Sequence, residues 1–254
     1  MSAANNQYFK MDERIWYSYE KRKYEGSAPW FYSKDHFEWV QKLENQYPRI
    51  KEEIVRALNA NEKDALPYFN REIVDENSVW KTLFFYFWGQ RNHKLIDQSP
   101  WLEKVFMDIP GFTSCAISKL EARSEIKWHP GDTSGIIRCH LPLIVPAGLP
   151  ECGFQVEEEE RAWVEGKLLM FCDAHRHRAF NRTNQDRIVL IIDVIHPGFS
   201  HHRRSIRANG LSIIWAQKIL GSASWLSSIK SVVRFCCLTF AYIYLPLQRN
   251  LKFL

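Results

Sequence analysis

The stretch W-H-P-G-D-T-S-G-I-I-R-C-H-L-P-L at residues 128–143 decides the fold expected of this chain. It is followed by F-C-D-A-H-R-H-R-A-F-N at residues 171–181 and by R-I-V-L-I-I-D-V-I-H-P at residues 187–197. All three stretches alternate short apolar runs with turn residues, a pattern typical of β-strands. His129 and His177 therefore lie on β-type segments far apart in sequence, with Arg187 ten residues after the second. The pattern suggests an iron site with a cation that anchors an oxo-acid.

The region around these motifs is expected to be mainly β. We predict strands at residues 80–88, 114–120, 126–129, 134–145, 153–157, 168–172, 177–181 and 187–195. Short strands at this spacing indicate a jelly roll, the double-stranded β-helix, with flanking helices. The chain contains neither a G-x-G-x-x-G fingerprint nor a P-loop, so the sequence gives no support to nucleotide chemistry.

Helices are expected before the strands. Ser33 is a good N-cap for an amphipathic segment that runs to Pro48, and a second amphipathic segment follows it to about residue 58. Ser99 and Pro100 form a cap and first-turn pair for a short helix. These helices are expected to support the sheet without taking part in chemistry.

Composition favours one catalytic core with appendages. The 254 residues are 46% hydrophobic and 14% aromatic, enough to fill a sizeable core. We expect an arm and supporting helices at residues 1–76, the core at 77–198 and a separate segment at 199–254. The six cysteines lack C-x-x-C spacing and no apolar signal region opens the chain, so we expect a reducing, cytoplasmic compartment without a disulfide framework.

The C-terminal segment is basic and apolar together. Residues 198–254 contain eight Lys and Arg and no acid, whereas the remainder has 26 Lys and Arg against 29 acids. Such a local charge does not indicate a nucleic-acid partner. The uncharged apolar run at residues 235–247 is too short for a membrane-spanning helix of ~20 residues.

Three interpretations of this segment stay open. It can lie on the inner face of a membrane, with apolar side chains in the headgroup boundary and cations on anionic lipid. It can form helices that pack on the domain or at a dimer interface. It can also dock a carrier protein.

A third protein ligand to iron is not expected. The usual non-heme pattern is two histidines and one carboxylate, but the position two after His129 is Gly131. The nearest acid, Asp132, is displaced by one residue, which turns its side chain to the other face of a strand.

The motifs, in this order and spacing, resemble the aspartyl/asparaginyl β-hydroxylase family of Fe(II)/2-oxoglutarate-dependent oxygenases. The resemblance is strongest over about residues 117–197. In that family two histidines hold the metal without a carboxylate, and glycine takes the vacant place. The resemblance implies hydroxylation of an unactivated carbon, with 2-oxoglutarate and O2 as cosubstrates and release of succinate and CO2.

The resemblance also implies roles for individual residues. His129 and His177 match the iron ligands, and Arg187 matches the residue that pairs with the distal carboxylate of 2-oxoglutarate. Ser118 falls where a hydroxyl contacts that carboxylate, and His140 where an imidazole lies near the metal. Either of these last two can equally satisfy hydrogen bonds in the core.

Two further assignments concern the surroundings of the cosubstrate. Arg138 matches a residue that contacts a substrate carboxylate, or it forms an ion pair within the domain. Tyr86 is aligned loosely with an aromatic residue beside the cosubstrate.

The substrate stays open at this level. We expect an Asp/Asn-type peptide or amino acid, with the acyl chain of a membrane lipid as the alternative. A jelly-roll binding module without catalysis is the non-enzymatic alternative.

Overall fold

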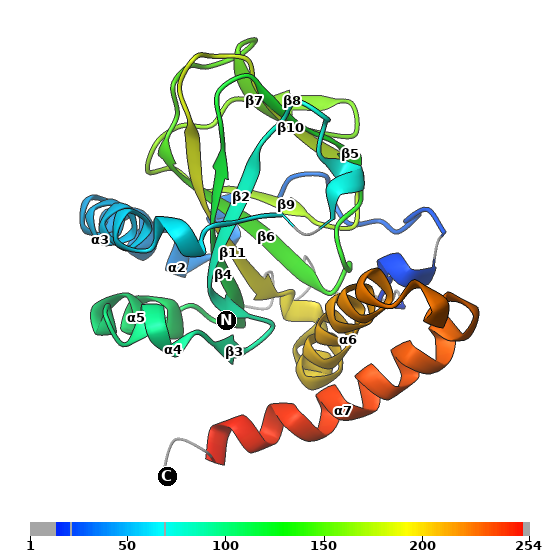
Figure 1. The fold of residues 1–254 in the computed structure, drawn as a ribbon. Helices are drawn as coiled ribbons and strands as arrows, with labels where there is room; N and C mark the ends of the chain where they lie inside the picture. Colours follow the sequence, from blue (N-terminus) through cyan, green and yellow to red (C-terminus); the bar gives the residue numbers. More distant parts are fainter. Residues whose placement is uncertain (1–13, 21, 69, 251–254) are drawn as a thin grey trace.

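The computed structural model describes residues 14–20, 22–68 and 70–250, so residues 1–13 of the expected arm lie outside the described residues. The described chain folds around a larger and a smaller antiparallel sheet (Figure 1). The larger runs in the order β1-β2-β4-β11-β6-β9, with β3 beside β2: β1 (Leu66–Pro67), β2 (Trp80–Phe87), β3 (Gln90–Arg91), β4 (Phe112–Leu120), β6 (Ile136–Ile144), β9 (Leu169–Cys172) and β11 (Arg187–Ile195). The smaller runs in the order β5-β10-β7-β8: β5 (Ser124–His129), β7 (Cys152–Val156), β8 (Glu159–Arg161) and β10 (His177–Asn181). The predicted double-stranded β-helix is confirmed.

Strand boundaries follow the sequence prediction closely where apolar alternation is strong. Strands β10 and β11 coincide with the predicted residues 177–181 and 187–195. The short strands β1, β3 and β8 were not predicted. Each has two or three residues, and pairing with a neighbour holds it in place without an apolar repeat of its own.

Alternation along the strands sorts the side chains of the larger sheet onto two faces. One face packs against the helices and includes Leu83, Ile117, Leu141 and Leu190. The other face meets the smaller sheet, and the cluster between the sheets includes Phe154, Trp163 and Phe171. The polar residues discussed below lie on this inner face.

The helices fall into two groups (Figure 1). The first group lies beside the larger sheet and contains α2 (Glu38–Asn45), α3 (Tyr47–Ala60), α4 (His93–Ile96) and α5 (Pro100–Met107). The break between the two predicted amphipathic helices falls at Gln46, and Pro48 lies in the first turn of α3, where its missing N–H is harmless. Short 3-10 helices occur at η1 (Ser18–Glu20), η2 (Lys34–His36), η3 (Glu62–Asp64), η4 (Arg71–Ile73), η5 (Pro197–His202) and η6 (Ser224–Ile229).

The second group is a C-terminal hairpin of α6 (Arg203–Ser222) and α7 (Lys230–Asn250). Ile206 and Leu211 of α6 are buried with Ala241 of α7 and with the ends of the sheet strands. The outer side of the hairpin instead exposes large apolar side chains, which are Ile219, Trp225, Ile229, Val232, Phe235, Phe240 and Ile243. Within the described residues, no helix has the length and apolar character needed to cross a membrane.

Candidate active site

A β-bulge brings the two motif histidines together on the inner face of the smaller sheet. His129 of β5 pairs with His177 of β10, but the next pair joins Ile126 to Ala179, so β5 has one extra residue. In a regular strand Ile126 and His129 would point to opposite faces. The bulge turns both inward, and the two imidazole rings lie 4.3 Å apart between centroids.

Hydrogen bonds assign the same tautomer to both rings. Nδ1 of His129 lies 2.7 Å from the Lys127 carbonyl, and Nδ1 of His177 lies 2.9 Å from the His175 carbonyl. A carbonyl only accepts, so each Nδ1 carries the proton and each Nε2 keeps its lone pair. This is the arrangement that orients histidine as a metal ligand.

Both imidazoles are neutral at physiological pH. Burial lowers the pKa of His129 to about 4. Burial, with the neighbouring His129, holds the pKa of His177 well below its usual value. Neutral imidazole is the form that binds a metal, so protonation does not oppose metal binding at pH 7.

Gly131 follows the first histidine where a side chain has no room. A Cβ added there would lie 2.0 Å from the carboxyl carbon of Asp173. The Asp173 carboxylate accepts a 2.8 Å hydrogen bond from the Asp132 N–H, and its backbone carbonyl accepts one from Gly131. Asp173 therefore fastens the loop after His129 to the segment that leads into His177.

Arg138 lies between buried acids. Its guanidinium forms ion pairs with Asp173 at 2.6 Å and with Asp193 at 2.8 Å. Asp193 faces Arg138 because the two residues are partners in the register of β6 and β11. The structure thus shows the ion pairing within the domain that the sequence left as an alternative, and the substrate contact of Arg138 stays a prediction.

Arg187 lies at the start of β11 and is only 2% exposed. One of its terminal nitrogens donates to the carbonyl and the hydroxyl of Ser118, at 3.1 and 3.2 Å. The same hydroxyl accepts a 2.9 Å hydrogen bond from Trp80, and the guanidinium lies 4.7 Å from the ring centroid of Trp163. The structure therefore brings the predicted pair Arg187 and Ser118 together.

The charge of Arg187 lacks a counter-ion among the described residues. Its Nε is buried without a hydrogen-bond partner there. Burial lowers its pKa to about 10, so the guanidinium remains charged at pH 7. A buried cation without a carboxylate is unfavourable unless a ligand supplies one. The orphaned donor fits the carboxylate of an oxo-acid.

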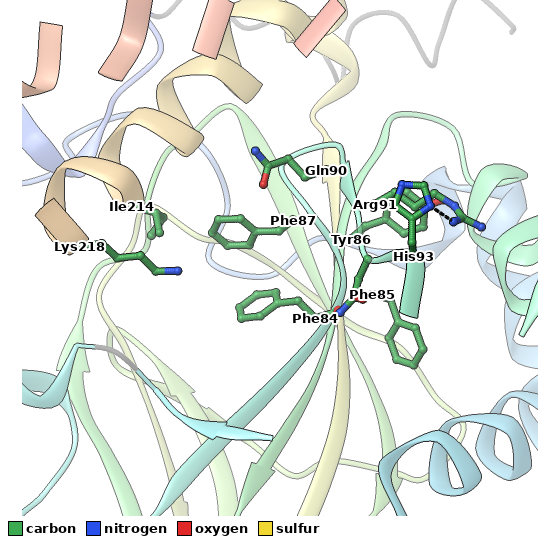
Figure 2. A pocket seen from close by; sticks show the side chains of 10 residues that line it. Phe84, Phe85, Tyr86, Phe87, Gln90, Arg91, His93, Ile214 and Lys218 are labelled. Carbon is green, nitrogen blue, oxygen red and sulfur yellow. Dashed lines mark hydrogen bonds between the residues drawn. The ribbon is translucent and has the colours of Figure 1, made fainter. Parts of the chain in front are cut away.

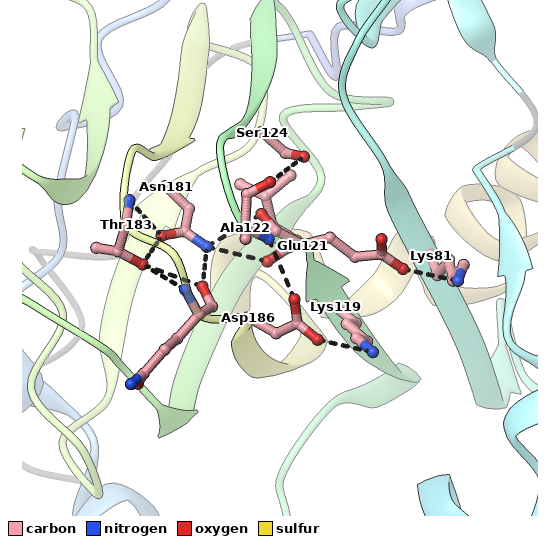
Figure 3. Close-up of polar contacts among 10 residues, drawn as sticks. Lys81, Lys119, Glu121, Ala122, Ser124, Asn181, Thr183 and Asp186 are labelled. Atoms are coloured by element: carbon pink, nitrogen blue, oxygen red, sulfur yellow. Dashed lines mark hydrogen bonds and ion pairs between the residues drawn. The ribbon is translucent and has the colours of Figure 1, made fainter.

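A polar network holds the turn between β10 and β11, which directly precedes Arg187 (Figure 3). The Asn181 amide donates to the carbonyls of Leu120, Glu121 and Gln185. The Asp186 carboxylate accepts from the Ala122 N–H and pairs with Lys119. The turn between β10 and β11 is thereby tied to β4, which also carries Ser118.

His140 lies between the histidine pair and Arg187 but has the opposite tautomer. Its Nδ1 accepts a 3.3 Å hydrogen bond from Trp163, so in the neutral ring Nε2 carries the proton. Burial and the nearby arginines hold its pKa well below the usual value. The ring contacts Phe154 and Phe171, which both also contact His177. His140 is thus arranged as a hydrogen-bond donor inside the barrel.

Tyr86 does not join this site. It lies in the cluster that faces the helices, and its hydroxyl donates to Glu103 of α5 at 2.6 Å. The irregular pairing between Phe84 and Tyr86 changes which face of the sheet the side chains after Phe84 point to, and a single sequence does not reveal this irregularity. Trp80 is the aromatic residue of β2 that reaches Ser118, and Tyr68 stacks on it at 3.9 Å.

An aromatic and cationic cluster lies on the outer face of the smaller sheet, because the residues that flank His177 in sequence point away from the face that His177 occupies. Arg176 and Arg178 flank His177 in sequence, and both guanidinium groups lie over the ring of Trp128, at 5.5 and 5.2 Å from its centroid. Trp128 itself precedes His129. In the described part of the chain, no group of three or more His, Cys, Asp or Glu side chains is placed to hold a metal.

The model of the aspartyl/asparaginyl β-hydroxylase family matches residues 44–197. The match covers more than half of the chain and includes both sheets and every site residue described above. The chain belongs to the aspartyl/asparaginyl β-hydroxylase family, and the prediction of a hydroxylase-type enzyme is confirmed at the level of the family.

Known relatives include proteins of different substrate classes. An ornithine lipid ester-linked acyl 2-hydroxylase of Rhizobium tropici is 32% identical over 166 residues, which cover 63% of this chain and 58% of that protein. The human aspartyl/asparaginyl beta-hydroxylase is 27% identical over 190 residues, covering 72% of this chain and 24% of that protein. The chain thus spans less than two thirds of either relative.

Among solved structures, a prolyl-4-hydroxylase of Pseudomonas putida covers 63% of this chain and all of its own. Its sequence identity is 11% and its TM-score is 0.40.

Proposed function

We propose that this protein is an Fe(II)/2-oxoglutarate-dependent hydroxylase that acts on the acyl chain of a membrane lipid. The observation that carries the activity is the histidine pair with both Nε2 atoms free, in the same barrel as an arginine that lacks a counter-ion. Family membership supports the same activity.

The residues fit both cosubstrate and metal. His129 and His177 would hold Fe(II), whose oxidative chemistry with O2 is what allows an unactivated carbon to be hydroxylated. Arg187 and Ser118 would bind the distal carboxylate of 2-oxoglutarate, and His140 would donate a hydrogen bond to a ligand oxygen. Phe154 and Phe171 contact both His140 and His177 and give these groups an apolar surrounding.

The lipid substrate is supported by the hairpin at the C-terminus. On α7, Val232, Phe235, Phe240 and Ile243 are all more than 55% exposed, and Ile229, directly before the helix, is 46% exposed. Trp225 at the turn is 77% exposed, and Lys230 begins the helix. Exposed apolar and aromatic side chains on a basic segment suit the surface of an anionic membrane. We therefore place the enzyme at a membrane surface.

Self-association through this face is the weaker interpretation. The segment contains no acid, so two copies packed face to face would bring like charges together. Flotation with vesicles tests the contact. Phosphatidylglycerol-containing vesicles should capture the wild type, and pure phosphatidylcholine vesicles should capture much less. Phe235→Ser with Phe240→Ser should lose binding, whereas Leu66→Ser with Val164→Ser, equally exposed but outside the hairpin, should keep it.

An Asp/Asn-type peptide is the second candidate substrate. It is supported by the likeness to the human aspartyl/asparaginyl beta-hydroxylase. Succinate release measured with lipid vesicles and with Asp-containing peptides separates the two candidates.

The cosubstrate site has a direct test. Adding 2-oxoglutarate without oxygen to the Fe(II)-loaded protein should give the visible absorption band of the chelated metal, and His177→Ala should abolish it. A folded, iron-loaded protein without this band would leave the jelly-roll binding module as the better proposal.

A further inference from the structure

A cavity of about 430 Å³ lies between the end of β2 and helix α6. Phe84 and Phe87 of β2 face Ile214 and Lys218 of α6 across it, while Phe85 and Tyr86 lie on the other side of the strand (Figure 2). Its volume falls within the range of about 300–1,000 Å³ typical of small-ligand sites. We propose that this cavity, the β2–α6 groove, holds the hydrocarbon chain of the substrate. The inference rests on the proposed function and names where the chain lies.

The groove continues the inner face of the larger sheet that carries His140. Register pairs join Phe84 to Ala116, Ala116 to Ile191, and Ile191 to His140. Paired residues project to the same face, so this row runs across the sheet from the candidate active site to the groove. Three strand spacings make it about 14 Å long. A linear chain laid along the row has one part beside His140 and another in the groove.

The row is suited to hydrocarbon along its length. Ala116 is small, and Ile191 and Phe84 are partly exposed, each interrupting an otherwise more buried stretch of strand. Ala116 and His140 are only 6% exposed, so the accessible part of the row is Ile191 and Phe84, whose apolar side chains would normally be covered on an inner face. A bound chain would cover them.

The walls of the groove also select the kind of ligand. Its lining is apolar on the side of Phe84, Phe87 and Ile214, and polar or cationic at Gln90, Arg91, Asn92, His93 and Lys218; within the described residues no Asp or Glu lines it. The Lys218 side chain extends from α6 toward Phe84 and Phe87, so its ammonium group lies in the groove opposite these rings (Figure 2). An anionic amphiphile fits such a surface better than an acidic peptide does.

Helix α6 links the groove to the membrane face. It lines the groove with Ile214 and Lys218, and its partner α7 carries the exposed apolar stripe. Ile206 of α6 also packs against the loop after His129, where a Cβ added at Gly135 would come within 2.9 Å of it. One helix therefore touches the groove, the active-site loop and the membrane-facing helix.

Fluorescence titration with cis-parinaric acid, kept below its micelle concentration, tests the proposal on the full chain. We expect saturable binding to the wild type and binding weaker by at least about tenfold in Phe84→Asp, since a buried charge replaces an apolar wall. Leu66→Asp places the same charge on an exposed residue of the same sheet and should bind like the wild type.

A photoreactive fatty acid then locates the chain. Its crosslinks should fall on residues 80–92 or 211–218. Three outcomes would each contradict the proposal that the groove holds the hydrocarbon chain. They are crosslinks elsewhere, equal binding by Phe84→Asp, and no binding by the wild type. The absorption band with Fe(II) and 2-oxoglutarate should survive in Phe84→Asp. If the protein binds the fatty acid in the groove but lacks this band, the groove is still a hydrocarbon-binding site, and the proposed Fe(II)/2-oxoglutarate activity is contradicted.

Discussion

The barrel interior and the outer face of the C-terminal hairpin depart in opposite directions from the usual pattern, in which apolar side chains are buried and polar ones are exposed. Inside the barrel, Arg187, His140, His177 and Asp173 are buried although they are polar or ionisable. On the hairpin, Trp225 and five other large apolar residues of 225–243 are exposed. Buried polar groups and exposed apolar patches are the informative deviations from ordinary burial. The proposed function accounts for both deviations, with a metal and an oxo-acid bound in the interior and a lipid surface against the hairpin.

The largest expected contrast uses the same residue type in both regions. Phe154 is 2% exposed between the sheets and Phe240 is 57% exposed on α7. Phe154→Ala should lower the free energy of unfolding by about 3–5 kcal/mol, because it leaves a cavity. Phe240→Ala should change it by less than about 0.5 kcal/mol. Urea denaturation measures both, and a comparable cost at Phe240 would show that the hairpin face is covered.

The histidine pair is the next test of the interior. His129→Ala or His177→Ala should weaken Fe(II) binding by more than about 100-fold, since losing only a hydrogen-bond partner of a metal ligand already costs about 10–100-fold. Succinate production should fall to background in both. His201→Ala removes an exposed histidine that lies outside the candidate site and the groove, and it is the matched control. Full activity in either ligand variant would contradict the assignment.

Arg187 should affect the cosubstrate but not the metal. Arg187→Met should weaken 2-oxoglutarate binding by at least about 30-fold, the equivalent of about 2 kcal/mol, because a buried carboxylate loses its partner. Arg187→Lys should retain part of the affinity, since the charge stays but the planar fork is lost. Titration of the absorption band of the Fe(II) protein measures both. Unchanged affinity in Arg187→Met would move the oxo-acid elsewhere.

Gly131 tests how tightly the loop after His129 is packed. Gly131→Ala should lower the free energy of unfolding by about 1–3 kcal/mol, because the new methyl group overlaps Asp173. Gly148→Ala is the control, since a Cβ there meets nothing within 4 Å and should be neutral or slightly stabilising. Denaturant midpoints compare the two variants. Equal values would show that the Asp173 carboxylate moves away from the new methyl group at little cost in free energy.

The strands and the histidine motifs could be predicted because their signals are local. Alternation defined β10 and β11, and the motif positions gave His129, His177, Arg187 and Ser118, which the structure brings into one barrel. The β5 bulge could not be seen, yet it is what turns His129 inward. It depends on the pairing of two strands about 50 residues apart in sequence, and a single chain does not record strand register.

The same limit explains the contacts that were missed. The pairing of Arg138 with Asp173 and Asp193 requires the register of β6 with β11 and the path of the loop before β10. The wrong placement of Tyr86 has the same origin, because the irregularity in β2 changes which face it occupies. Composition did indicate the basic, apolar hairpin, but only the structure separates its packed side from its exposed side.

Proton release on metal binding gives the smallest and most specific signal. Burial lowers the pKa values of His129 and His177, so both are already neutral at pH 6. Two ordinary histidines with a pKa near 6.5 would be mostly protonated at pH 6 and would release about 1.5 protons when the metal binds. Here the release should be close to zero at pH 6. Calorimetry with Fe(II) at pH 6, in buffers of different ionisation enthalpy, counts these protons. Release above one proton per metal would mean that the imidazoles are solvated before binding, which would make the site resemble the exposed hairpin more than the interior.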